Sequence, residues 1–243
     1  MIEAAFWGLV GGIALLVGAL AGLRLRTSNR LIGLIMAFGA GVLVSALAFD
    51  LTREAFDRGG GTAVVIGLAA GALAFYGGDW ILDHHGGQDR KRSGGQQAAG
   101  NGMAIVLGAL LDGIPESVAI GVSLLGGGAV GVPVVAAVFL SNVPESLSAA
   151  TGLRKAGHTT RWILGLWTAV ALVSAVAAGL GFVLLGGASP AVIGVIQAFA
   201  AGAILTMLAD TMMPEAFEHG GNSVGVITAL GFTLAFLLSR AGG

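Results

Sequence analysis

Two short segments of this chain place acidic side chains beside a proline in the middle of long apolar runs. The segments are Leu111-Asp112-Gly113-Ile114-Pro115-Glu116-Ser117 and Leu140-Ser141-Asn142-Val143-Pro144-Glu145-Ser146. A carboxylate at the centre of a membrane-spanning helix costs about 2.5 to 3.5 kcal/mol on insertion scales. Three carboxylates in such a place therefore need a compensating partner, and the residue types favour a cation.

The spacing within each segment gathers oxygen atoms on one side of a helix. Asp112 and Glu116 are four residues apart and share a helical face, and Glu145 follows Ser141 by the same interval. Pro115 and Pro144 each remove a backbone donor and kink the helix beside an acid. Carboxylate, amide and hydroxyl oxygens together suit a divalent metal ion. We predict as ligands Asp112, Glu116, Asn142 and Glu145, with Ser117, Ser141 and Ser146 as additional candidates.

An ion pair with a basic residue is the first alternative to metal. No Lys, Arg or His lies within the core of the third to seventh predicted spans, so an ion pair has no obvious partner there. Acids that stay protonated inside the bundle remain the second alternative.

The composition is that of an integral membrane protein. The chain has 243 residues, of which 56% are hydrophobic and 10% charged, and its mean hydropathy is +0.91. No soluble domain of this length has such a composition. The apolar runs are long enough to cross a hydrocarbon core of about 30 Å as helices. The sequence holds no cysteine, which excludes thiolate metal sites and a cysteine nucleophile.

The apolar runs predict an all-α membrane protein with eight spans in a single domain, residues 1–243. We expect the spans at about 4–23, 31–52, 62–82, 103–125, 132–152, 162–185, 190–213 and 223–239. Residues 83–102 between the third and fourth spans are polar and rich in glycine, so we expect a mobile loop there. The first run is followed, not preceded, by arginines, and is expected to remain as a span.

The distribution of basic residues predicts the orientation. With both termini outside, nine of the twelve Lys and Arg residues fall in loops on the inside. These nine are Arg24, Arg26, Arg30, Arg90, Lys91, Arg92, Arg154, Lys155 and Arg161.

An internal repeat joins the second and seventh spans. Residues 38–60 and 199–221 are identical at ten of 23 aligned positions, including Glu54-Ala55-Phe56 and Glu215-Ala216-Phe217. Spans five apart cross a membrane in opposite senses, so the repeat is inverted. Inverted repeats with interrupted helices are typical of secondary transporters that bind substrate near the midplane.

Further acids and histidines are candidates for the path of the ion. The pathway candidates are Asp50, Glu54, Asp210 and Glu215. Glu54 and Glu215 fit ordinary interfacial residues equally well, whereas Asp50 and Asp210 lie one turn deeper, which favours a pathway role. His84 and His85 are candidates for metal capture at the inner mouth, and an ordinary solvated loop is the alternative.

The chain resembles the ZIP (Zrt/Irt-like) family of divalent metal transporters. The resemblance rests on eight spans, an inside loop with histidines between the third and fourth, and Pro-Glu pairs in the fourth and fifth. It implies a 3+2+3 arrangement with inverted repeats, a place in the cell membrane with both termini outside, and a homodimer as candidate assembly. It implies no organic cofactor and no nucleic-acid partner.

The sequence departs from the family pattern in one direction. The family's fourth-span motif commonly begins with His-Asn, whereas Asp112-Gly113 stands here, and Asp50 replaces a histidine common in the second span. Carboxylates in place of imidazole make a harder site, which weakens the case for zinc and strengthens that for manganese, iron(II) or magnesium.

Three classes of function fit these residues to different degrees. The leading interpretation is a transporter, not an enzyme, that carries divalent cations toward the cytoplasm. A membrane protein operated by protons or a ligand, which moves no metal, is the alternative. Intramembrane hydrolysis by paired carboxylates fits less well, because that chemistry needs two aspartates that face each other. The paired acids here are glutamates, each directly after a proline.

Overall fold

Helices make up most of the part of the chain that the structure describes. The computed structural model describes residues 1–25, 27–126 and 131–241, so Arg26, one of the predicted inside residues, lies outside the described part. The helices are α1 (Ile2–Arg24), α2 (Asn29–Ala46), α3 (Thr52–Asp83), α4 (Gly102–Ser123), α5 (Val132–Lys155), α6 (Thr160–Leu185), α7 (Pro190–Met207), α8 (Met213–Gly220) and α9 (Val224–Ala241). Short π-helical segments, η1 (Leu47–Leu51) and η4 (Leu208–Met212), join α2 to α3 and α7 to α8.

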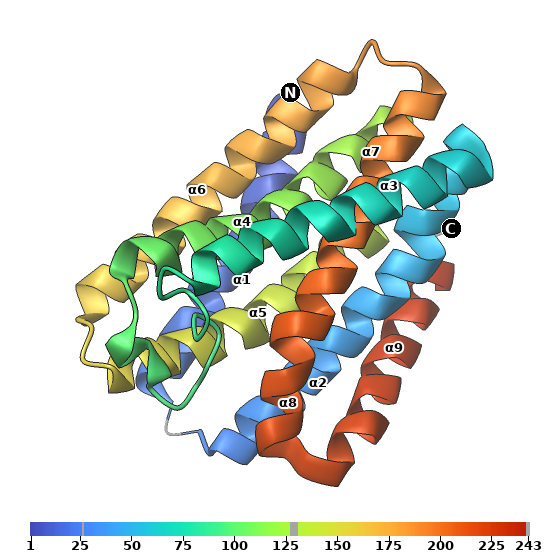
Figure 1. Cartoon of the computed structure of the whole chain (residues 1–243). Coiled ribbons are helices and arrows are strands. Elements are labelled where there is room, and N and C mark those ends of the chain that lie inside the picture. The colour runs from blue at the N-terminus through green and yellow to red at the C-terminus, as the bar shows by residue number, and fades with distance from the viewer. Residues whose placement is uncertain (26, 127–130, 242–243) are drawn as a thin grey trace.

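Six helical stretches in the described residues are long and apolar enough to cross a membrane. Two of them are much longer than one crossing needs, 29–83 and 190–240. Both change direction at a glycine with positive φ, Gly60 at 71° and Gly221 at 60°. Figure 1 shows each stretch as two rods that meet at an angle at these turns.

Side-chain caps set several of the helix starts. Ser28, Thr159 and Ser189 each accept a hydrogen bond from the backbone N–H three residues later, at 3.2, 3.2 and 3.4 Å. Asn101 caps α4 by accepting from the N–H of Met103 at 2.9 Å. These oxygens satisfy backbone donors that a first turn leaves without partners.

Most of the helices pack in pairs. α3 lies along α7, α2 lies along α9, and α1 lies between α5 and α6 (Figure 1). Glycines allow the closest of these contacts: a Cβ at Gly202 would collide with the backbone oxygen of Leu68, and one at Gly41 with that of Thr228. Small residues at such contacts are what helix association in lipid depends on.

A polar segment closes one end of the bundle. Residues 84–101, here called the basic loop, connect α3 to α4 and fold back over the ends of α4 and α5 (Figure 1). We call this end of the bundle the loop end. Ser93 and Gln97 of the basic loop are buried, so the segment is packed against the helices despite its polar composition, and its mobility stays a prediction.

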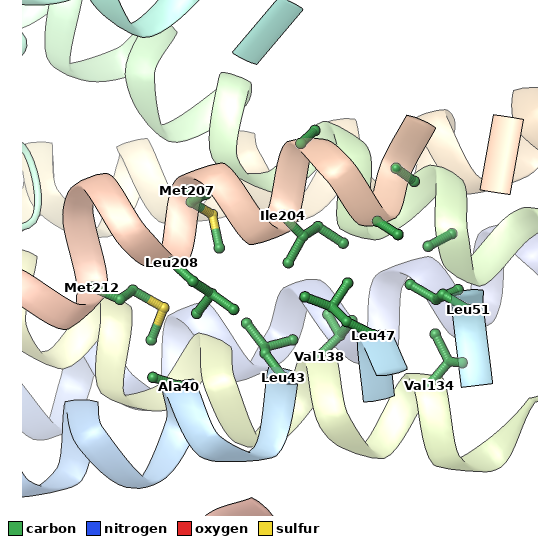
Figure 2. Close-up of a cluster of buried hydrophobic side chains, with 14 of the residues drawn as sticks. Ala40, Leu43, Leu47, Leu51, Val134, Val138, Ile204, Met207, Leu208 and Met212 are labelled. Carbon is green, nitrogen blue, oxygen red and sulfur yellow. The ribbon is translucent and has the colours of Figure 1, made fainter. Parts of the chain in front are cut away.

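At the other side of the centre, buried apolar side chains of α2, η1, α5 and α7 form a cluster. Figure 2 shows Leu43 and Leu47 facing Val138 of α5 and Ile204 of α7. Along α5, Val138 precedes Glu145 by seven residues, which is roughly 10 Å of helix. The apolar cluster therefore closes the bundle on the side away from the basic loop.

Candidate metal centre

The two Pro-Glu segments lie inside α4 and α5, where both helices continue through Pro115 and Pro144. Asp112, Glu116 and Glu145 are buried, with 2, 1 and 3% of their surfaces exposed. Asp112 of α4 and Glu145 of α5 both lie 3.3 Å from the same atom, Nζ of Lys91. The structure thus places these two acids, which the sequence analysis selected, on either side of one cation.

The basic loop supplies two cations to these acids. Arg90 holds Asp112 with two hydrogen bonds, Nε to Oδ2 at 2.9 Å and Nη2 to Oδ1 at 3.0 Å. Its Nη2 also donates to Asp79 of α3. Lys91 Nζ lies 3.3 Å from Asp112 Oδ2 and 3.3 Å from Glu145 Oε1. Both basic side chains are almost completely buried.

These ion pairs correct the sequence interpretation, which found no basic partner for the central acids. That search covered the spans alone, whereas Arg90 and Lys91 reach the site from a connection. Burial by itself would lower the pKa of Arg90, but attraction to Asp112 and Asp79 outweighs it, so the pKa is raised. The guanidinium is therefore charged at physiological pH.

The remaining predicted ligands already make hydrogen bonds. Asn142 Nδ2 donates to the backbone oxygen of Gly11 in α1 at 3.0 Å, which leaves the amide oxygen for another partner. Ser117, Ser141 and Ser146 donate their hydroxyl hydrogens to carbonyls of their own helices, at 2.7, 3.0 and 2.7 Å. Their oxygens keep lone pairs that a cation could use.

The present arrangement is an ion-pair network. Within the described residues no group of three His, Asp or Glu is placed to hold a metal ion. Glu116 Oε1 is buried and has no hydrogen-bond partner among the described residues. A cation at this place would therefore have at least one carboxylate oxygen available that no neighbour satisfies.

Glu215 anchors the basic loop from the other long helical stretch. Its Oε1 accepts from the Ser93 N–H at 2.8 Å and lies 3.2 Å from Ser148 Oγ on α5. The Ser148 hydroxyl is also 2.7 Å from the backbone oxygen of Lys91. The acid predicted to line a pathway thus fixes the segment that carries Arg90 and Lys91.

The other predicted pathway residues are apart from the central acids. Glu54 pairs with Arg58 at 2.9 Å and accepts from Gln197 of α7 at 2.7 Å. Asp50 accepts from Ser239 of α9 at 2.7 Å. Asp210 is exposed and lines a small cavity with Arg90, Lys91 and Arg92 of the basic loop.

The two candidate capture histidines are exposed at the end of α3. His84 Nδ1 is 2.7 Å from the Trp80 oxygen and His85 Nδ1 is 2.7 Å from the Ile81 oxygen. Such contacts orient each ring so that Nε2 points away from its own helix turn. Their role in metal capture stays a prediction.

The fold and these buried polar groups define a multi-pass helical membrane protein with a charged centre. The sequence profile of the family described as "ZIP Zinc transporter" matches residues 82–239. The chain belongs to the ZIP family, whose members transport divalent metals, and is a transporter and not an enzyme.

Curated relatives agree with that assignment. "Zinc transporter ZupT" of Enterobacter sp. (strain 638) is 29% identical over 250 residues, which cover 96% of both chains. The protein of the same name in Salmonella heidelberg is 29% identical over 245 residues, or 94% of this chain and 95% of its own. A "putative zinc transporter" of Arabidopsis thaliana is 28% identical over 194 residues, 79% of this chain but 31% of the plant protein.

Proposed function

We propose that this protein carries divalent metal ions toward the cytoplasm through the acids of α4 and α5. Asp112, Glu116 and Glu145 supply the charge, and Asn142 supplies a neutral oxygen. The observation that carries the proposal is the burial of these three carboxylates between two helices, in a chain whose family transports metals. Buried acids in a membrane protein are expensive and mark an ion pathway.

Zinc is the first ion to consider, because the similar proteins are named as zinc transporters. The predicted donors are all oxygen atoms, however, and oxygen donors do not favour zinc over harder ions. We propose that manganese and iron(II) also pass. His84 and His85 are proposed to collect metal ions at the inner face, where nitrogen donors favour the softer zinc.

We further propose that the fold is an eight-span inverted repeat with both termini outside. Three pairs of matched features support it, each 161 positions apart: Leu47 and Leu208 begin the π-helical segments, Leu51 and Met212 end them, and Gly60 and Gly221 make the turns. The stretches 29–59 and 191–220 also run in opposite senses, because Gly33 packs against Gly220 and Gly59 against Ala191. Relative motion of the two repeats would expose the central acids first to one side of the membrane and then to the other.

Uptake into proteoliposomes tests the proposal. Purified protein should accelerate entry of Zn²⁺, Mn²⁺ or Fe²⁺ above that in protein-free vesicles, and unlabelled metal should compete. Flux of protons with none of these metals would instead support the alternative of a proton-operated protein. Absence of any metal flux from an active, folded preparation would refute the proposal.

A further inference from the structure

Two positive charges of the chain lie where the proposed function puts the transported ion. Lys91 Nζ is within 3.3 Å of both Asp112 and Glu145, which come from different helices. Arg90 covers the remaining edge of Asp112 with two hydrogen bonds. A metal ion bound between Asp112 and Glu145 would need the same oxygens, with metal–oxygen distances of about 2.0 to 2.6 Å.

The charges also match. Arg90 and Lys91 together carry the charge of one divalent cation. Without the basic pair or a metal ion, the carboxylates of Asp112, Glu116 and Glu145 would have no positive charge beside them. Buried like charges so close together cannot all stay ionised. The pair therefore offsets part of this negative charge when no metal is bound.

The helices are shaped to receive the loop that carries this pair. A Cβ at Gly108 of α4 would collide with the Arg90 side chain, and one at Gly152 of α5 with the Arg92 oxygen and the Gln97 amide. Ser148 and Glu215 hold the backbone of the same segment. Contacts with α4, α5 and α8 therefore hold the loop in a specific docked position.

Two small cavities adjoin the docked segment. One small cavity lies between Lys91 and α4, α5 and α6, and another between the segment and Asp210. The loop begins and ends at exposed turns, and Gly86 and Gly95 have positive φ, of 90° and 95°. Movement of residues 88–93 would therefore not require α3 or α4 to unfold.

We propose that Arg90 and Lys91 are a tethered cation that competes with the transported metal for Asp112 and Glu145. Metal binding expels the pair from the bundle, and the returning pair displaces metal toward the loop end. The basic loop thereby sets how tightly the resting protein binds metal. This inference rests on the proposed function, because it takes these acids as the transport site.

Metal titration of full-length variants tests the competition. Zn²⁺ and Mn²⁺ are titrated calorimetrically into detergent-solubilised protein in which His84 and His85 are Ala, so that the loop histidines bind no metal. Lys91→Gln should tighten binding at least about tenfold, the lower end of what close charge pairs contribute. Gly152→Ala should also tighten binding, because it unseats the loop without changing the charge of the chain.

Arg154→Gln is the matched control, because Arg154 bonds to the backbone oxygen of Leu23 and to none of the acids. It removes the same charge from the same end of the bundle and should leave the affinity unchanged. Equal tightening by Arg154→Gln would reduce the effect to net charge and overturn the inference.

Labelling provides a readout that keeps both basic residues. Ser93→Cys, the single cysteine in the chain, should be protected from a water-soluble thiol reagent without metal and labelled when metal is added, because Ser93 is fully buried. Gln96→Cys, at an exposed position of the same loop, should be labelled under both conditions.

The outcomes separate the inference from the proposed function. If the parent binds metal and Lys91→Gln and Gly152→Ala bind it with the same affinity, the competition is refuted and the proposed transport is not. The same holds if Ser93→Cys is equally protected with and without metal. No metal binding by parent or variants overturns both.

Discussion

Lys91 Nζ lies 3.3 Å from Glu145 Oε1, so a residue of a connecting loop contacts an acid in the middle of a helix 54 positions later in the chain. The same ammonium group is 3.3 Å from Asp112 on the neighbouring helix. The two central helices are thereby joined through a side chain that belongs to neither.

Replacement of Arg90 should destabilise the metal-free protein. Arg90→Gln leaves Asp79 buried without this partner and Asp112 with Lys91 alone, and the loss of one member of a buried pair costs about 3 to 5 kcal/mol. The unfolding temperature in detergent should fall clearly. Arg53→Gln is the control, since the Arg53–Asp57 pair is mostly exposed and such pairs contribute about 0 to 1 kcal/mol. Equal shifts in the two variants would contradict the account.

Ion preference should respond to the donor at position 112. Asp112→His replaces a carboxylate with an imidazole, which suits zinc better than manganese. Competition assays in proteoliposomes should therefore show zinc displacing manganese more effectively in the variant than in the parent. An identical ranking of ions in both proteins would mean that this side chain does not set selectivity.

The two repeated halves should be equally sensitive at their closest helix contacts. Gly41→Ala and Gly202→Ala each push a Cβ into a neighbouring backbone oxygen, and overpacking of this kind costs about 1 to 3 kcal/mol. Gly225→Ala meets nothing within 4 Å and should stabilise its helix slightly. Thermal unfolding of the three variants checks the prediction, and tolerance of Ala at position 41 or 202 would refute the packing.

Leu47 and Leu208 should become accessible from opposite sides of the membrane. They occupy equivalent positions of the two repeats, and both are buried in the apolar cluster of Figure 2. Under alternating access, Leu47→Cys should react with an impermeant thiol reagent only from outside, and Leu208→Cys only from inside. No native cysteine interferes. Reaction of both from one side would argue against exchange between two inverted halves.

The sequence was informative wherever burial and spacing decide the structure. The spacing of Asp112 and Glu116 predicted a shared position, and the apolar runs predicted helices close to those observed, such as 102–123 for an expected span of 103–125. The repeat also drew attention to Gly59-Gly60 and Gly220-Gly221, where both long stretches turn. These features depend on local periodicity and on glycine conformation.

The position of the basic loop could not be read in the same way. Its composition predicts a solvated segment, but Arg90 and Lys91 are buried because tertiary contacts with three acids outweigh their local preference. One feature of the sequence could have predicted this contact, the charged run Asp89-Arg90-Lys91-Arg92. This run adjoins spans that contain more acids than bases. Charge balance between a loop and its spans would have suggested the contact.

Metal uptake by Glu145→Gln tests the central claim most directly. Glutamine keeps the size of Glu145 and removes its charge, so the proposed site loses a ligand while α5 keeps its packing. Uptake of Zn²⁺ into proteoliposomes should fall at least about tenfold, and Glu3→Gln, at an exposed position of the first turn, should transport like the parent. Parent-like uptake by a folded Glu145→Gln protein would contradict transport through the acids of α4 and α5.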